Sequence, residues 1–210
     1  MVSGKFITLE GIEGVGKTTA IDTVTSFCEN YLNKKVINTR EPGGTKLAER
    51  FRDILLEETE EHMTSRAELL LFFAGRAQHI SELIEPALQK GYFVISDRFI
   101  DATYAYQGGG RGVDLNVIKT LENMVHPNLK PDLTLLLDAP LDICAKRVNS
   151  RKFKDRFEQE QDDFFEKVRN SYLKRANQEP QRIKIVNANQ SINGVQKSIE
   201  NELLKAFNES

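Results

Sequence analysis

Cysteine is scarce in this sequence, and so are the signals of a secreted or membrane-bound protein. The 210 residues include two cysteines, Cys28 and Cys144, whose separation fits no metal-ligand spacing. We expect both thiols to be buried in a protein from a reducing compartment. The N-terminus lacks the apolar core of a signal peptide, and no apolar run approaches the ~18 residues of a membrane span. The sequence therefore predicts a cytoplasmic protein that does not enter a membrane.

An excess of positive charge is also missing. Lysine and arginine number 29 against 31 acidic residues, which gives a net charge of −2 and a pI near 6.0. This balance argues against a nucleic-acid partner. Apolar residues make up 40% of the chain and charged residues 29%, as in ordinary globular proteins. With no internal repeat or long linker, we expect one domain over residues 1–210.

A phosphate-binding loop is present near the N-terminus. The stretch 11–18, Gly-Ile-Glu-Gly-Val-Gly-Lys-Thr, fits G-x-x-x-x-G-K-[ST] and lies between an apolar run and a predicted helix. Such a loop turns its backbone N–H groups toward phosphates, while Lys17 reaches the β- and γ-phosphates and Thr18 ligates Mg²⁺. A glycine-rich turn that matches by accident is the alternative. We assign nucleotide binding, which the resemblance given below narrows to ATP, to Gly11, Ile12, Glu13, Gly14, Val15, Gly16, Lys17, Thr18 and Thr19.

Strand-like runs alternate with helical patterns along the chain, which is typical of an α/β fold with a parallel sheet. Strands are predicted at 5–10, 35–39, 92–96, 132–138 and 182–186. Helices are predicted near 17–32, 47–58, 64–90, 114–125, 140–150, 160–178 and 192–207. The charged segment 149–161 has few apolar residues, so we expect a mobile lid there.

Apolar residues spread widely around the predicted helix 64–90, where Pro86 is expected to bend its end. One stripe at helical spacing is predicted to be buried, and it comprises Phe73, Ala77, Ile80, Ile84, Ala87 and Leu88. Further apolar residues at 69–73 extend this surface around the circumference, which suggests deep burial or a partner subunit.

Two predicted strands end in charged residues. Asp97 and Arg98 follow the strand 92–96, and an acid at this position of a P-loop protein holds Mg²⁺ or its water shell. A local ion pair that caps the next helix is the alternative. Arg40 and Glu41 follow the strand 35–39, at the sheet edge where ligands bind in this architecture. For Arg52, spacing alone leaves open whether it binds a ligand or is a surface charge.

Together the motifs resemble those of the bacterial thymidylate kinase family, which are P-loop nucleoside-monophosphate kinases. The resemblance rests on residues 11–18, 39–44, 71–76, 97–99, 106–108 and 155–158 in the family's order. It implies transfer of the γ-phosphate of ATP to dTMP with Mg²⁺, and a homodimer. It also implies a three-layer fold with a five-stranded parallel sheet in the order 2-3-1-4-5, flanked by helices.

The resemblance implies a dTMP pocket. Phe72 would stack on thymine, while Arg76 and Gln107 would face the polar edge of the pyrimidine, with Thr103 on the same wall. Tyr106 would crowd the sugar 2′ position and so favour deoxyribose.

Other residues would bind the sugar and the phosphates. Glu13 would lie near the sugar 3′-hydroxyl, and Arg52 and Arg98 would hold the acceptor phosphate. Arg147 and the loop 187–190 would lie near adenine.

The same resemblance implies a catalytic arginine in the lid. The phosphate of a nucleoside monophosphate has a second pKa of about 6, so it is mostly dianionic at neutral pH. It can therefore attack the γ-phosphate without a general base. The P-loop has no arginine, so positive charge for the transferring phosphoryl group must come from elsewhere. Arg151 matches the family's lid position and joins Lys17 and Arg98 as the predicted catalytic residues. Phe153 and Lys154 depart from the small residues expected in such a lid.

Two other functions remain possible at this stage. A deoxynucleoside kinase would need a carboxylate base, for which Glu13 or Glu41 is available. A nucleotide-dependent switch is another class, but the guanine-reading Asn-Lys-x-Asp motif is missing. The sequence suggests no partner or role for His62, His79 or His126.

Overall fold

The computed structural model describes residues 4–57, 59–149, 156–157 and 160–207. Its centre is a five-stranded sheet in the order β2-β3-β1-β4-β5, and each neighbouring pair is parallel. The strands are β1 (Lys5–Glu10), β2 (Val36–Arg40), β3 (Phe93–Asp97), β4 (Leu133–Asp138) and β5 (Ile183–Asn187). The predicted sheet order is confirmed, although four strands begin one residue later than expected.

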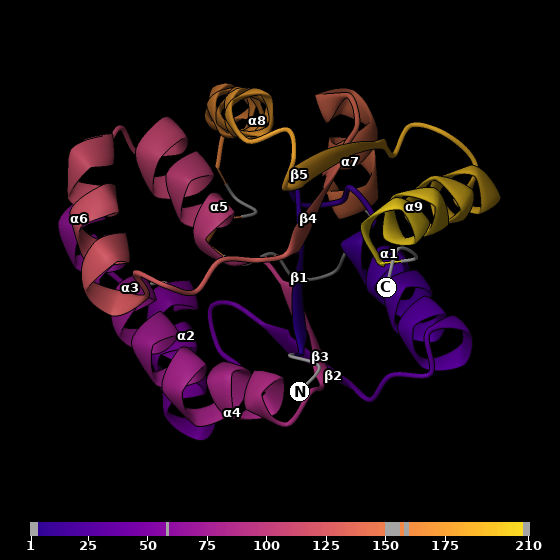
Figure 1. Cartoon of the computed structure of the whole chain (residues 1–210). Coiled ribbons are helices and arrows are strands. Elements are labelled where there is room, and N and C mark those ends of the chain that lie inside the picture. Colours follow the sequence, from indigo (N-terminus) through magenta and orange to yellow (C-terminus); the bar gives the residue numbers. More distant parts are fainter. Residues whose placement is uncertain (1–3, 58, 150–155, 158–159, 208–210) are drawn as a thin grey trace.

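Helices surround this sheet (Figure 1). They are α1 (Lys17–Ser26), α2 (Lys46–Leu56), α3 (Ser65–His79), α4 (Glu85–Gln89), α5 (Ile100–Thr103), α6 (Leu115–Val125), α7 (Leu141–Asn149), α8 (Asp162–Gln178) and α9 (Ile192–Phe207). Three π-helical turns extend or join them, at Phe27–Tyr31, Ile80–Ile84 and Tyr104–Gly110. In the part of the chain that the structure describes, no helix combines the length and apolarity that a membrane crossing requires.

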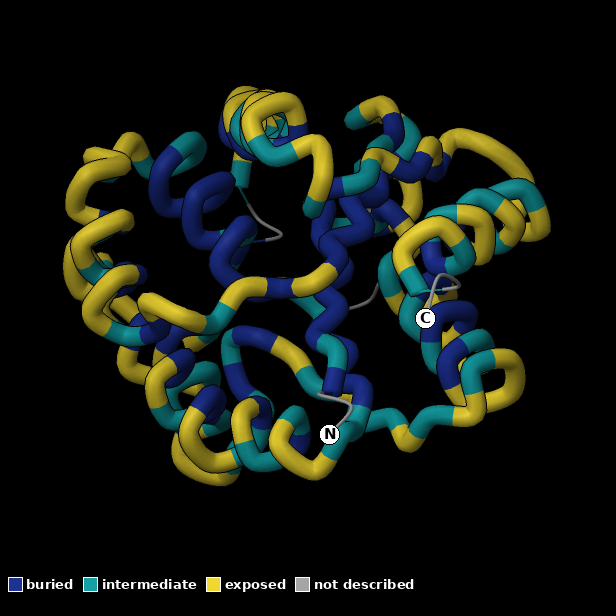
Figure 2. Tube along the Cα trace, viewed as in Figure 1, coloured by how far each residue is buried: buried dark blue, intermediate teal, exposed yellow. Residues whose placement is uncertain are grey.

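Side chains of β1 alternate between the two faces of the sheet, as strand geometry requires. Ile7 and Leu9 join a core cluster with side chains of α1 and α9, whereas Phe6 packs in a second cluster with side chains of α3 and α6. Figure 2 shows the buried residues along the central strands and α5, with exposed residues on the outer sides of the peripheral helices. Glu10 lies on the same face of the sheet as Phe6 and is fully buried.

The helix predicted at 64–90 is α3 and α4 joined by the π turn at Ile80–Ile84. Pro86 lies in the first turn of α4, where a missing N–H is tolerated. The prediction of a buried Ala77 was wrong because the buried face of α3 includes Arg76 and His79 instead. These polar side chains are buried because each has a carboxylate partner, described below.

The sequence analysis missed the helical segment formed by α5 and the turn Tyr104–Gly110. Three successive glycines at 108–110 have low helix propensity, which masked it. Packing explains them. A β-carbon on Gly109 would lie 2.6 Å from Cβ of Ser171, and one on Gly110 would overlap the ring of Phe164. The glycines therefore let α8 approach this segment closely.

Candidate functional site

A cleft of about 490 Å³ opens at the carboxyl ends of β1, β2 and β3. The predicted site residues that line it are Glu13, Gly14, Gly16, Lys17, Thr18, Thr19, Arg52, Phe72, Arg76, Asp97, Arg98, Thr103, Tyr106, Gln107 and Arg147. Gly11, Ile12 and Val15 belong to the same loop but are buried beneath it. Arg151 lies outside the described residues. Elements distant in sequence thus bring nearly all predicted residues to one cavity.

The loop between β1 and α1 has the backbone that phosphate binding requires. Gly14 has φ of +76°, and a β-carbon there would overlap the carbonyl oxygen of Cys144 in α7. Helix α1 begins at Lys17, so its first N–H groups point toward the cleft. Lys17 Nζ donates to the carbonyl oxygens of Gly11 (3.2 Å) and Ile12 (3.4 Å). Burial, and then the charge of Arg98, lower the pKa of Lys17.

Asp97 and Thr18 form an oxygen donor set of the kind that Mg²⁺ uses. Asp97 ends β3 and lines the cleft, and its buried Oδ1 has no hydrogen-bond partner among the described residues. Thr18 lines the same cleft from the start of α1. Kinase Mg²⁺ ions are typically held by one or two protein oxygens together with substrate phosphates and water. The orphaned Asp97 oxygen fits that arrangement.

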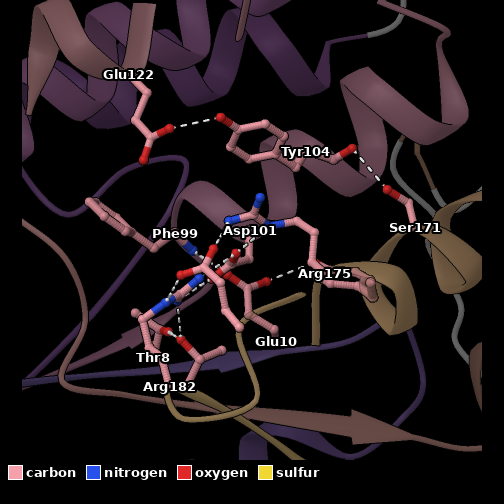
Figure 3. Close-up of polar contacts among 12 residues, drawn as sticks. Thr8, Glu10, Phe99, Asp101, Tyr104, Glu122, Ser171, Arg175 and Arg182 are labelled. Carbon is pink, nitrogen blue, oxygen red and sulfur yellow. Dashed lines mark hydrogen bonds and ion pairs between the residues drawn. The ribbon is translucent and has the colours of Figure 1, made fainter. Parts of the chain in front are cut away.

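Arg98 is held in a left-handed backbone conformation, with φ of +69°. Its N–H donates to the Leu9 carbonyl at 2.9 Å, and its carbonyl accepts from Ser96 Oγ at 2.7 Å. The next N–H, that of Phe99, donates to Glu10 Oε1 at 2.8 Å (Figure 3). These bonds stabilise a conformation that is otherwise unfavourable for arginine. They therefore fix where the side chain leaves the backbone.

Glu10 connects this turn to α8. Its second carboxyl oxygen accepts a 2.7 Å hydrogen bond from Tyr172 Oη. Burial, and then the nearby Asp101, raise the pKa of Glu10 to about 8. Asp101 accepts bonds from Arg175 (2.6 Å) and Arg182 (2.7 Å), which Figure 3 shows converging on it. The turn that carries Arg98 therefore rests on a buried polar network.

Glu13 lies between two of the predicted substrate-binding side chains. Arg98 Nη2 donates to Glu13 Oε1 at 2.7 Å, and Tyr106 Oη donates to Glu13 Oε2 at 2.6 Å. The Arg98 guanidinium also lies 4.7 Å from the Tyr106 ring centroid. Burial favours the neutral acid, but the charges of Arg98 and Lys17 outweigh it, so the pKa of Glu13 is lowered. The carboxylate form thus holds the tyrosine and the arginine together.

Arg76 is almost fully buried and has several partners. Its Nε donates to Glu41 Oε2 at 2.8 Å, and Nη2 donates to Thr103 Oγ1 at 2.9 Å and to the Phe99 carbonyl at 3.2 Å. Nη1 has no hydrogen-bond partner within the described part of the chain. One donor of this cleft-lining arginine is therefore left for a ligand.

His79 has the partners that the sequence did not reveal. Its Nδ1 is 3.1 Å from Glu41 Oε1, and its Nε2 is 2.7 Å from Thr39 Oγ1. His126 Nδ1 donates to the Leu129 carbonyl at 3.1 Å, whereas His62 is exposed. His79 thus braces the carboxylate that holds Arg76.

An aromatic wall closes one side of the cleft. Phe72 lines it from α3, with its ring centroid 6.1 Å from that of Phe157, which lies 6.1 Å from Tyr106. Phe157 is buried, so the lid segment has an apolar anchor that the sequence analysis missed. Its position in the Asp-Arg-Phe-Glu motif was the available signal.

A buried acid behind this wall was also missed. Glu68 accepts from Gln107 Nε2 at 2.8 Å and from Arg156 Nη2 at 2.7 Å. Its place one helical turn before Phe72 was the only sequence signal.

Two further arginines reach the cleft. Arg52 Nη1 donates to the Pro42 carbonyl at 2.9 Å, and Arg147 Nη1 donates to the Gly14 carbonyl at 3.2 Å. Arg147 also lines a second cavity of about 270 Å³, between the P-loop, Ala188, Gln190 and α9. This cavity adjoins the loop between β1 and α1.

Comparisons with known proteins agree with this geometry. A sequence model described as thymidylate kinase matches residues 9–199. A thymidylate kinase of Pseudomonas putida (strain GB-1) is 51% identical over 199 residues, covering 95% of this chain and 94% of the relative. Another, from Nitrosospira multiformis, is 48% identical over 204 residues, covering 97% and 98%. The crystal structure of thymidylate kinase from Ehrlichia chaffeensis superposes with a TM-score of 0.78 at 32% identity, covering 96% of this chain and 99% of that one.

Proposed function

The chain belongs to the thymidylate kinase family, and we propose that the cleft described above carries out the family's reaction with the residues assigned below. The enzyme transfers the γ-phosphate of ATP to dTMP, giving dTDP and ADP, in dTTP synthesis. The observation that best supports the assignment is that Lys17, Arg98, Arg76 and Gln107 line one cavity. In this proposal a donor phosphate binds at the Lys17 end of the cavity and a pyrimidine monophosphate binds beside Arg76 and Gln107.

ATP binds along the P-loop in this proposal. The N–H groups at the start of α1 and Lys17 hold its phosphates, and Arg147 together with the cavity beside Gln190 receives the adenine end. Mg²⁺, held by Thr18 and Asp97, supplies charge neutralisation of the phosphates when bound.

The acceptor binds on the opposite wall. Phe72 stacks on the base, and Arg76 and Gln107 face its polar edge. The Tyr106–Glu13 pair would lie against the sugar, where the ring of Tyr106 would crowd a 2′-hydroxyl. Arg98 and Arg52 hold the 5′-phosphate from either side. These cations align two anions that would otherwise repel each other.

The available carboxylates disfavour a sugar-hydroxyl acceptor. Glu13 is engaged by Arg98 and Tyr106, and Glu41 by Arg76 and His79. A deoxynucleoside kinase needs a carboxylate poised to take a hydroxyl proton. Both acids instead organise neighbouring side chains, which suits a phosphate acceptor that needs no base.

ADP release measured with dTMP, with thymidine and without an acceptor tests this function. We expect ADP release with dTMP but not with thymidine or without an acceptor. Lys17→Ala should nearly abolish the turnover with dTMP, because the lysine neutralises donor phosphate charge. Thr18→Ala should raise the Mg²⁺ concentration needed for half-maximal activity. Thermal unfolding of both variants should match that of the wild type. Wild-type turnover by Lys17→Ala, or turnover with thymidine, would contradict the assignment.

We also propose a homodimer formed through α2, α3 and α6, which lie together in Figure 1. Helix α3 packs against both others. The exposed large apolar side chains of these helices are Leu47, Ile54, Leu70, Leu115, Val117 and Met124. A second copy of the chain would cover them. Light scattering at micromolar concentration should give twice 23.9 kDa, and Leu70→Glu should halve it; a monomeric wild type would exclude the dimer.

A cytoplasmic location is consistent with the thiols of Cys28 and Cys144, both free and buried. Cell fractionation with detection of the chain tests this location. Recovery in a periplasmic or membrane fraction would contradict it.

A further inference from the structure

Glu68 is a buried acid, and within the described part of the chain it contacts neither Lys17 nor Arg98. It lies in α3 one turn before Phe72, and 1% of its surface is exposed. Its Oε1 accepts from Gln107 Nε2 at 2.8 Å and lies 3.5 Å from Arg111 Nε, while Oε2 accepts from Arg156 Nη2 at 2.7 Å. A buried carboxylate is tolerated when such partners compensate for its lost hydration. One oxygen of Glu68 therefore binds the Gln107 amide, and the other binds the Arg156 guanidinium.

The contact with Glu68 decides which way the Gln107 amide points. The oxygen and nitrogen of a glutamine side chain have nearly the same shape, so only their hydrogen bonds distinguish the two orientations. A carboxylate accepts hydrogen bonds and donates none, so the amide must present Nε2 to Glu68. Arg156 places a positive charge beside the other oxygen of this carboxylate.

The amide oxygen of Gln107 is then available to a ligand. Gln107 lines the cleft, and no described residue donates a hydrogen bond to its Oε1. An acceptor in this position suits a pyrimidine whose N3 carries hydrogen, as in thymine. It repels a pyrimidine whose N3 carries a lone pair, as in cytosine.

We infer that Glu68 is a specificity-determining residue, which selects thymine over cytosine by fixing the Gln107 amide with its oxygen toward the base. The inference rests on the proposed dTMP pocket. Glu68 touches no substrate and is a positioning residue, acting through Gln107. Arg76 reads another part of the same edge, so the two contributions are separable.

The test compares kcat/KM for dTMP with that for 5-methyl-dCMP. Both substrates carry the 5-methyl group, so only the polar edge of the base differs. In Glu68→Gln, the new amide can donate to Gln107 Oε1 and let Gln107 turn its N–H toward N3. An N–H of Gln107 that faces N3 pairs with the lone pair of cytosine and leaves thymine N3–H without an acceptor. We therefore expect the preference for dTMP to fall about ten-fold. An unchanged preference would overturn the inference.

Two controls separate orientation from general damage. The ratio of kcat/KM for dTMP and dUMP should stay at the wild-type value in Glu68→Gln, because the amide does not contact the methyl group. Arg111→Gln removes a charge beside Glu68 without touching Gln107, so its preference for dTMP over 5-methyl-dCMP should also be unchanged. Equal loss of activity on all three substrates would indicate a purely structural role for Glu68.

A double-mutant cycle distinguishes failure of this inference from failure of the pocket assignment. Gln107→Met should lower the preference for dTMP, and adding Glu68→Gln should lower it no further. If Gln107→Met leaves the preference unchanged, the pocket assignment fails. If Gln107→Met lowers it but Glu68→Gln does not, only the role of Glu68 fails. Should Glu68→Gln not fold, Glu68→Asp withdraws the carboxylate while keeping its charge, and the same loss of preference is expected.

Discussion

The guanidinium of Arg98 lies 2.7 Å from the carboxylate of Glu13, although the two residues are 85 positions apart in the chain. The contact forms because the backbone of Arg98 turns left-handed directly after β3 and sends its side chain across the end of β1. Ser96, Leu9 and Glu10 hold that turn by hydrogen bonds. Backbone strain is thus concentrated at a residue assigned to the acceptor phosphate, as is common in active sites.

Replacing Arg98 separates strain from function. Arg98→Ala and Arg98→Gly should both lower kcat/KM for dTMP by roughly 10² or more, because each removes the phosphate-binding cation. The glycine variant should be the more stable by about 1 kcal/mol, since glycine adopts φ near +69° without the β-carbon clash. Urea unfolding of the two variants measures this difference. Equal stability would indicate that the left-handed turn carries no strain.

Arg76 should contribute to both base choice and stability. Arg76→Ala removes a donor from the base pocket and takes from the buried Glu41 carboxylate its arginine partner, while the bond to His79 stays. Loss of one partner from a buried ion pair costs about 3–5 kcal/mol. We therefore expect a lower unfolding free energy and a weaker preference for dTMP over dCMP, with ATP affinity preserved. Adding Glu41→Gln should restore part of the stability but not the base preference. Wild-type discrimination in Arg76→Ala would contradict the pocket assignment.

Local patterns in the sequence were enough to find the phosphate-binding loop and the strands. Residues 11–18 form a continuous motif, and each strand is a short apolar run with turn residues after it. The strand order and the dTMP pocket came from family resemblance, because spacing does not say which strands are neighbours. Arg52 illustrates the limit: its spacing left two roles open, and the resemblance then implied a role at the acceptor phosphate. The fold places Arg52 in the cleft.

Contacts between residues that are far apart in the chain could not be predicted from the sequence. Glu41 and His79 are 38 residues apart, and nothing near either one signals the other. The same holds for Glu68 and Gln107, separated by 39. The helix at 100–110 was missed for another reason, because close packing against α8 favours glycines that helix propensity disfavours.

Arg151 remains the predicted source of catalytic charge, although it lies outside the described residues. The P-loop contributes no arginine, and an arginine that stabilises the transferring phosphoryl group is generally worth about 10³–10⁵ in kcat. Arg151→Ala should therefore lower kcat and kcat/KM together, with KM for dTMP nearly unchanged. Arg151→Lys should recover little, because the planar fork of donors is lost. Single-turnover kinetics would show whether chemistry is the slowed step.

A matched variant shows whether removing any positive charge from this segment lowers kcat. Lys152→Ala removes a neighbouring cation and should leave kcat within a few-fold of wild type. If Arg151→Ala behaves like Lys152→Ala, the catalytic charge comes from a different residue.

Glu10 should make the stability of the folded protein fall as pH rises, which is the opposite of the usual effect of an acid. Its pKa is raised to about 8 from 4.5, first by burial and then by Asp101. Between these two values the folded state keeps a proton that the unfolded state releases, so the contribution of Glu10 to stability falls as pH rises. One proton changes the unfolding free energy by at most about 1.4 kcal/mol per pH unit. Tyr172, Arg98 and the Phe99 N–H also face this carboxyl and act against the shift.

Glu10→Gln imitates the protonated carboxyl and cannot ionise, so it should remove this dependence. The unfolding free energy of the variant minus that of the wild type, measured in urea from pH 5 to pH 8, should increase with pH.

His126, whose pKa is lowered from 6.5 by burial and by Arg76, titrates in the same range but is present in both proteins and cancels in the difference. Glu49→Gln is the matched control. Burial favours the neutral Glu49, but the hydrogen bonds from Arg40 and from the Gly44 N–H outweigh it, so the pKa of Glu49 is lowered and its own window lies below pH 4.5. Its difference should stay flat from pH 5 to pH 8. A flat or falling difference for Glu10→Gln would show that Glu10 is ionised in the folded protein, and the carboxylate would then have to be stabilised by Arg98 and Tyr172 despite its burial.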